Sequence, residues 1–153
     1  KITKKIQDSS TGQIINTSKV LTINIKPGWK SGTKITFKGE GDEIHGEPAQ
    51  DVCFIIDELP HRHFKRDGDN LIVNANIPLK TALCGGTFTI NSIDNQSIPI
   101  PLKKIINNED KHKIKGYGMP KKNGSFGDLI IKYHILMPES LTYEQKQKLS
   151  IIL

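Results

Sequence analysis

The five histidines of this 153-residue chain are its most versatile side chains, because imidazole can bind metal ions and transfer protons near neutral pH. Only His61 and His63 stand close together, with one residue between them. A metal site needs three or four ligands at characteristic spacings, and no third ligand accompanies this pair at such a spacing. We therefore expect no metal site.

Two glycine-containing turns have part of the spacing of ligand-binding loops. Gly39-x-Gly41, followed by Gly46, has the start of a phosphate-binding loop, but no Gly-Lys-Ser/Thr follows and the next expected element is a strand. Asp67-x-Asp69 lacks the later acidic ligands of a calcium loop and is typical of a tight turn. Both stretches predict turns, and we expect no cofactor.

Covalent and acid-base catalysis also lack a signature in the chain. No Ser/His/Asp or Cys/His set has a recognisable local pattern. Cys53 and Cys84 are the only cysteines and form no Cys-x-x-Cys pair, which excludes a zinc site built from thiolates and disfavours a disulfide framework. The sequence therefore predicts a protein that is not an enzyme and that works in a reducing compartment, the cytoplasm.

The charge balance indicates acidic partners. With 22 Lys and Arg against 16 Asp and Glu, the net charge of +6 attracts nucleic acid, anionic membranes or acidic peptides, although a merely solvated lysine surface explains the same count. Aromatic residues make up only 6% and do not alternate with lysines as base stacking needs. No apolar run approaches the ~20 residues that cross a bilayer. We expect neither a nucleic acid nor a membrane as partner.

Apolar residues alternate with polar ones along much of the chain, which is typical of half-buried strands. The turn pairs Pro27-Gly28, Asp94-Asn95 and Asn123-Gly124 separate these segments. Strands are expected around Ile2 and over residues 20–25, 34–38, 52–56, 71–77, 86–90, 98–102, 112–115 and 129–136.

A repeat with a period of 77 residues organises these strands. The shift superimposes Lys34, Lys38, Gly39, Gly41 and Asp51 on Lys111, Lys115, Gly116, Gly118 and Asp128 without a gap. Each copy has a strand that ends in Lys-Gly-x-Gly, a loop that closes with Asp, and a second apolar strand. The sequence therefore predicts two small β domains of similar topology, residues 1–67 and 68–139.

The last residues, 140–153, predict a helix. Thr142 with Gln145 three residues later forms a capping box, and Leu149, Ile152 and Leu153 share one face. A helix this short needs to bury that face, either on its own domain or on a partner subunit.

At this point several stretches resemble a known family. Residues 25–42 (IKPGWKSGTKITFKGEGD), 60–68 (PHRHFKRDG), 82–86 (ALCGG) and 127–130 (GDLI) resemble the C-terminal, peptide-binding part of class B DnaJ-type co-chaperones, the forty-kilodalton heat-shock proteins. The resemblance covers essentially the whole chain. Because the chain begins with Lys1 inside an expected strand, we expect it to be a fragment.

The resemblance implies an architecture and a function. Family members carry an N-terminal J-domain, a Gly/Phe-rich linker, two β-sandwich domains and a C-terminal dimerisation helix. Class A members insert a zinc module into the long hairpin of the first domain, and this chain has no cysteines in that hairpin. The implied function is binding of unfolded client polypeptides, and of the acidic EEVD tail of the seventy-kilodalton heat-shock chaperone, by strand addition in a homodimer.

The resemblance also implies site residues. By position, Lys1 and Lys19 meet the carboxylates of the tail, while Ile2 and Phe64 line an apolar depression for its hydrophobic side chain. In the second domain, Phe88 and Ile90 suggest a second client groove. Dimerisation is assigned to the helical segment, with the residues Leu141, Leu149, Ile152 and Leu153.

Two other functions remain open from the sequence. A basic nucleic-acid-binding β domain accounts for the net charge, and a purely structural dimerisation module accounts for the terminal helix. The groove of the resembling family also uses a strand upstream of Lys1, which is not in this chain.

Overall fold

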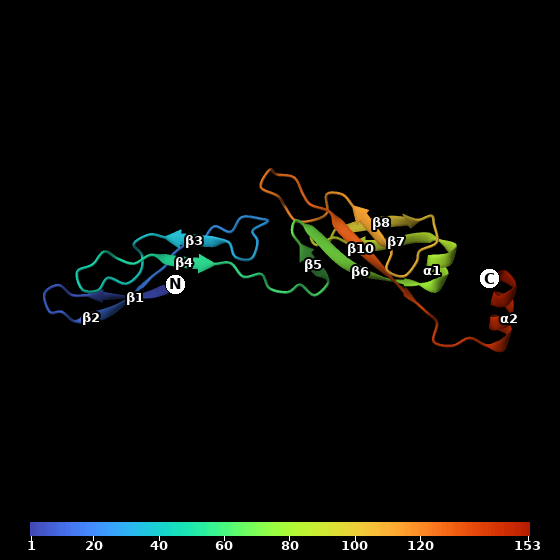
Figure 1. The fold of residues 1–153 in the computed structure, drawn as a ribbon, viewed down its shortest axis with the longest axis horizontal. Helices are drawn as coiled ribbons and strands as arrows, with labels where there is room; N and C mark the ends of the chain where they lie inside the picture. Colours follow the sequence, from blue (N-terminus) through green and yellow to red (C-terminus); the bar gives the residue numbers. More distant parts are fainter. The chain divides into compact units, whose positions relative to one another are not determined.

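The computed structural model describes residues 1–153, which form two compact units, Lys1–Pro60 and His61–Leu153. We call them unit 1 and unit 2 and describe each by itself. Both are built mostly of β-strands (Figure 1). The predicted mainly β fold is therefore confirmed, while the compact units divide after residue 60 rather than after residue 67.

Unit 1 consists of two antiparallel strand pairs. β1 (Ile2–Gln7) pairs with β2 (Ile14–Lys19), and β3 (Lys34–Phe37) pairs with β4 (Val52–Ile55). No hydrophobic side chain of unit 1 is fully buried. The apolar surface of this unit therefore stays partly accessible.

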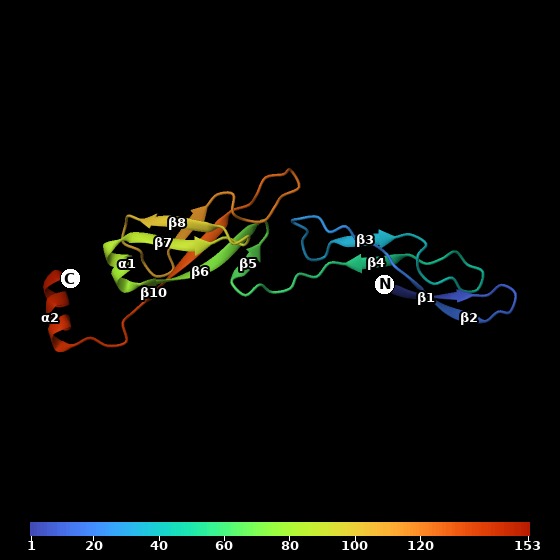
Figure 2. The ribbon, with the colours of Figure 1, turned by 180° about the vertical axis from the view of Figure 1, so that it is seen from behind.

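Unit 2 is built on a mixed four-stranded sheet with the strand order β5-β6-β10-β9. The central strands β6 (Asn70–Pro78) and β10 (Leu129–Leu136) run parallel, and β5 (Phe64–Asp67) and β9 (Lys111–Ile114) flank them antiparallel. Helix α1 (Leu79–Cys84) leads into the hairpin of β7 (Gly86–Asn91) and β8 (Ser97–Leu102). Seen from behind in Figure 2, α1 and this hairpin lie beside β6 and β10.

The hydrophobic core lies entirely in unit 2, between the four-stranded sheet and the hairpin. Alternate residues of β6 and β10 point into it, and Ile77, Leu129 and Ile131 are completely buried. Each such side chain stabilises the fold by roughly 2 kcal/mol through removal of apolar surface from water. The core is formed by Leu71, Val73, Ala75, Ile77, Ala82, Ile90, Ile98, Ile100, Leu102, Leu129, Ile131 and Tyr133.

The predicted repeat is present in the backbone pairing. In unit 1 the register joins Phe37 to Val52, and in unit 2 it joins Ile114 to Leu129, which are the same positions shifted by 77 residues. The other three residue pairs of each ladder obey the same shift. The β3–β4 and β9–β10 ladders are therefore two copies of one structure.

The two glycines of each Lys-Gly-x-Gly segment have different tasks. Gly39 and Gly116 have φ angles of 69° and 81°, and their N–H groups donate to the carboxylates of Asp51 and Asp128. Gly41 lies so close to the next segment that an added Cβ would stand 2.8 Å from the carbonyl oxygen of Gln50. The first glycine permits a left-handed turn, and the second permits close packing of two backbones.

One predicted strand is wrong. Within residues 20–25 the side chains of Leu21 and Ile23 are half-buried and their neighbours are exposed, as a strand would require. The segment nevertheless forms no strand in the structure. Alternation reports which face a side chain occupies, but a strand also needs a neighbour that accepts its backbone hydrogen bonds. No ladder partner lies beside this segment in unit 1.

Three elements were not predicted. β2 is mostly polar, and β5 lies in the charged stretch that we expected to link the domains. Helix α1 is only six residues long and directly follows Pro78, the last residue of β6.

The predicted C-terminal helix is confirmed as α2 (Tyr143–Ile152), and its capping box is present. The Thr142 hydroxyl accepts a hydrogen bond from the Gln145 N–H, and the Gln145 side chain accepts one from the Thr142 N–H. No residue of α2 is buried, and Ile151, Ile152 and Leu153 are about four-fifths exposed. The apolar side chains at the end of α2 are therefore largely uncovered, while Leu149 is half-buried. No helix in the structure has both the length and the apolar character that crossing a membrane requires.

Candidate functional site

The β1–β2 hairpin of unit 1 carries three of the predicted site residues. A tight turn after Asp8 joins the strands, and the Asp8 carboxylate accepts hydrogen bonds from the hydroxyl and the N–H of Ser10. The bond from the hydroxyl, followed by that from the N–H, lowers the pKa of Asp8 below its ordinary value. This turn sets a register in which Ile2 lies directly opposite Lys19, next to Lys1.

The outer edges of the two strands differ. Along the second half of β1, the Glu43 N–H donates to the Lys5 carbonyl and the Gln7 N–H donates to the Glu43 carbonyl, so this edge is occupied by the chain itself. Strand β2 pairs with β1 only, and its main-chain groups on the other side form no hydrogen bond within unit 1. An added strand can therefore pair with β2.

Apolar side chains accompany this open edge. Ile14 and Ile15 on β2 are 55% and 53% exposed, and Val20 directly after β2 is 72% exposed. Ile2 is half-buried on the paired strand. The β2 edge thus combines unpaired backbone groups with exposed aliphatic surface.

The ammonium group of Lys19 already has a partner. Its Nζ lies 2.5 Å from a carboxylate oxygen of Glu40, and the two side chains are 47% and 26% exposed. Lys1 is exposed and forms no ion pair within the chain. An acidic ligand that binds Lys19 therefore has to compete with Glu40, a residue that sequence reasoning missed because it stands in the turn Gly39-Glu40-Gly41.

The opposite end of the hairpin has the wrong charge for an acidic ligand. A hollow of about 470 Å³ lies beside the turn, and its wall includes Asp8, Glu43 and Glu47. The cationic and anionic ends of the hairpin are therefore separate, and an acidic tail fits only the end with Lys19.

Phe64, the fourth predicted residue, belongs to unit 2. It lies on β5 opposite Val73, and its ring is partly buried against the core with the His61 ring at 5.3 Å. Since the structure describes the units separately, the joint use of Phe64 and Ile2 stays a prediction.

The residues of the predicted second groove lie in the interior of unit 2. Ile90 is 9% exposed and belongs to the core, and Phe88 packs on that core with its ring 6.4 Å from that of Tyr133. Both side chains stabilise unit 2, and the Ile90 side chain is not accessible to a ligand while that of Phe88 is only partly accessible. We therefore do not retain this second site.

The histidine pair has a structural task. The Nδ1 atom of His61 accepts hydrogen bonds from the N–H groups of His63 and Phe64, at 3.1 and 3.2 Å. No group of three or more His, Cys, Asp or Glu side chains in the structure is arranged to hold a metal ion. His61 instead fixes the entry into β5.

The chain thus combines two related β units, an open strand edge and a terminal helix. The model of the DnaJ C terminal domain matches residues 1–138, and the chain therefore belongs to the DnaJ family. Its sequence is 39% identical over 149 residues to the human DnaJ homolog subfamily B member 5, covering 96% of this chain and 43% of that protein.

Further relatives agree. The chain is 41% identical over 138 residues to DnaJ protein homolog 1 of Drosophila melanogaster, covering 88% of this chain and 41% of that protein. It is 36% identical over 151 residues to the human DnaJ homolog subfamily B member 13, covering 97% and 48%. The chain thus spans less than half the length of each of these relatives.

Proposed function

We propose that this chain is the part of a DnaJ-type co-chaperone that binds extended peptides by adding them as a strand to β2. The unpaired edge of β2 is the observation that carries the proposal. Backbone pairing provides affinity for many sequences, and the exposed side chains of Ile14 and Ile15 favour apolar segments. Such a surface suits unfolded clients, which expose apolar residues in extended conformations.

The same edge suits the acidic EEVD tail of the seventy-kilodalton heat-shock chaperone. Lys19 at the end of β2 and Lys1 near it supply ammonium groups for the tail carboxylates, and Ile2 opposite Lys19 supplies an apolar contact. Phe64 is kept as a proposed contributor from unit 2. The proposal places this work in the cytoplasm, where free thiols such as those of Cys53 and Cys84 persist.

The proposal includes a homodimer held by α2. None of its apolar side chains is fully buried on its own unit, and a second copy of the helix offers a matching apolar surface. Two peptide sites in one dimer would raise the avidity for long clients without any new contact.

Titration of a fluorescein-labelled peptide that ends in EEVD tests the site by anisotropy. We expect saturable, salt-dependent binding by the chain and at least several-fold weaker binding by Lys19→Glu. Lys5→Glu is the matched control, because its charge change is the same while its main chain faces away from β2. Equal losses in both variants, or no binding by the unaltered chain, would show that β2 is not the site.

A further inference from the structure

The positive charge of the chain belongs to one unit. Unit 1 holds 8 Lys and Arg and 8 Asp and Glu, so its formal charge is zero. Unit 2 holds 14 Lys and Arg against 8 Asp and Glu, which accounts for the whole net charge of +6. The proposed peptide-binding edge of β2 lies in the neutral unit 1, so it does not explain the positive charge of unit 2.

Part of the excess is concentrated on the outer face of the four-stranded sheet. Because side chains alternate along a strand, the residues between the core positions of β6 and β10 point away from the core. The register aligns Lys113, Ile130, Ile72 and Lys65 in one row across all four strands. The next row aligns Lys111, Lys132 and Asn74. We call Lys65, Lys111, Lys113 and Lys132, with Ile72 and Ile130 between them, the lysine face.

The lysine face contains an uncompensated repulsion. Lys111 and Lys132 are direct cross-strand neighbours in an antiparallel ladder, where Cβ atoms stand about 5 Å apart and like charges destabilise the pair. In the repeat copy of unit 1, the same two positions are held by Lys34 and Ile55. The architecture itself therefore does not require two lysines here.

No acidic side chain neutralises these lysines. None of the four forms an ion pair or a side-chain hydrogen bond within the chain. Asp110 and Asp128 accept hydrogen bonds from the Asn107 and Gly116 N–H groups, and Asp67, which shares the outer face of β5 with Lys65, forms no ion pair with it. The face thus carries the exposed lysines Lys65, Lys111 and Lys113 and the half-buried Lys132 around two half-buried isoleucines.

We propose that the lysine face is a second binding surface, independent of β2, for an acidic peptide segment that also carries aliphatic side chains. Carboxylates of such a segment pair with the lysines of both rows and relieve the repulsion between Lys111 and Lys132. Its aliphatic side chains cover Ile72 and Ile130. A nucleic acid would match the charge, but the two rows contain no Phe, Tyr or Trp ring on which a base could stack.

The test uses the full chain with Lys19→Glu, so that the proposed tail site of unit 1 is removed. The probe is a short fluorescein-labelled peptide in which pairs of Glu flank single Leu residues, and anisotropy reports its binding. Adding Lys132→Glu should weaken binding roughly tenfold, because one ammonium group is reversed and Lys111 gains an internal partner. The same substitution should raise the melting temperature, since a like-charge pair becomes an opposite-charge pair.

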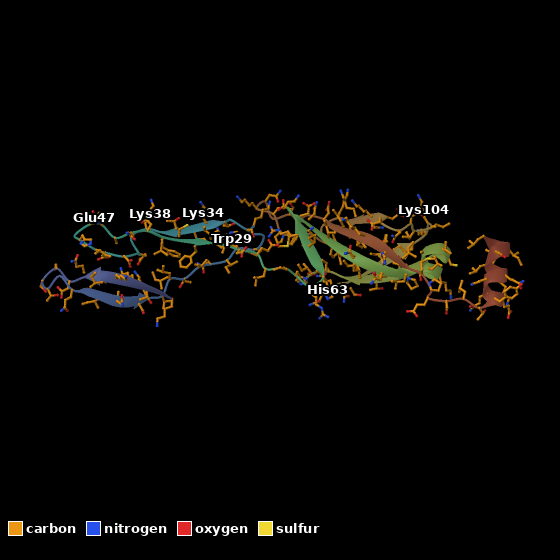
Figure 3. The ribbon with its side chains drawn as sticks, turned by 60° about the horizontal axis from the view of Figure 1, so that its bottom comes forward. Trp29, Lys34, Lys38, Glu47, His63 and Lys104 are labelled. Carbon is orange, nitrogen blue, oxygen red and sulfur yellow. The ribbon has the colours of Figure 1, made fainter.

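Lys104→Glu is the matched control. It changes the net charge equally, but Lys104 is exposed in the loop that follows β8 (Figure 3). Strand β8 belongs to the β7–β8 hairpin, which packs on the inner face of the sheet and not on the lysine face. Its effect on affinity should stay below about twofold. Equal losses for Lys132→Glu and Lys104→Glu would overturn the proposal, as would an absence of binding in the Lys19→Glu background. Tighter binding of oligothymidylate than of the peptide would overturn it in favour of nucleic acid.

Discussion

Release of Lys19 from Glu40 should strengthen the binding of an acidic tail. The Lys19 ammonium group lies 2.5 Å from the Glu40 carboxylate, and a tail carboxylate needs the same group. Glu40→Gln keeps the size and the hydrogen-bonding capacity of the side chain while it removes the competing charge. The bound tail then no longer has to break an existing ion pair.

The exposure of the two side chains sets the magnitude. With 47% and 26% of their surfaces accessible, Lys19 and Glu40 form a solvent-screened pair worth about 0.5 to 1 kcal/mol. That free energy corresponds to roughly a two- to fivefold lower Kd of the tail peptide for Glu40→Gln at low ionic strength. At high salt the gain should shrink because the pair is screened.

A double-mutant cycle separates this effect from a general change in charge. In a Lys19→Gln background, Glu40→Gln should have almost no effect on the anisotropy titration, because the lysine that it releases is absent. Glu43→Gln is the control, since it removes the same charge from unit 1. Glu43 pairs with Lys4 instead of Lys19, with the Lys4 Nζ 3.4 Å from the Glu43 Oε1. If Glu43→Gln strengthens binding as much as Glu40→Gln, or if Glu40→Gln weakens binding, competition for Lys19 is not the reason.

Three further predictions concern stability and assembly. Gly118→Ala should lower the free energy of unfolding of unit 2, measured in urea, by about 3 kcal/mol, because the added Cβ would stand 2.6 Å from the Asp69 carbonyl oxygen. Gly116→Ala is the control, since a Cβ at Gly116 would meet no atom within 4 Å. An equal or smaller loss for Gly118→Ala than for Gly116→Ala would contradict this. Tyr133→Phe should raise the free energy of unfolding by about 1 kcal/mol, because the buried hydroxyl has no hydrogen-bond partner. Burial also raises the pKa of Tyr133, so the unaltered protein should lose stability above about pH 10 more steeply than the variant; equal slopes would refute this. Deletion of residues 141–153 should convert dimers to monomers in sedimentation at unchanged melting temperature, since α2 buries no side chain on its own unit; persistent dimers would place the interface elsewhere.

The repeat could be predicted because its signals are local. Lys-Gly-x-Gly and the closing Asp impose a turn and a close backbone contact, and such demands are visible in residue types alone. The capping box of Thr142 and Gln145 is equally local, and it is present as expected. Local chemistry therefore located both the duplicated ladder and the start of α2.

The errors concern contacts between distant segments. The alternation in residues 20–25 predicted a strand, but the hydrogen-bond partner of a strand lies elsewhere in the chain and cannot be seen in the alternation. Phe88 and Ile90 were assigned to a groove by analogy of position, whereas Ile90 belongs to the core of unit 2 and Phe88 packs against that core. The partnership of Lys19 with Glu40 also depends on how two hairpins meet, and no sequence pattern signals it.

If the β2 edge and the lysine face both bind acidic ligands, the different charges of the two units should give the two sites different salt dependences. Unit 1 has no net charge, so an acidic tail at β2 gains little from long-range attraction and depends on local contacts with Lys19 and on backbone pairing. Unit 2 carries the whole excess charge and has four lysines on one sheet face, so its attraction for anions reaches farther and is more sensitive to salt. Rising ionic strength should therefore weaken binding at the lysine face more steeply than binding at the β2 edge. Parallel salt dependences would mean that one surface accounts for both.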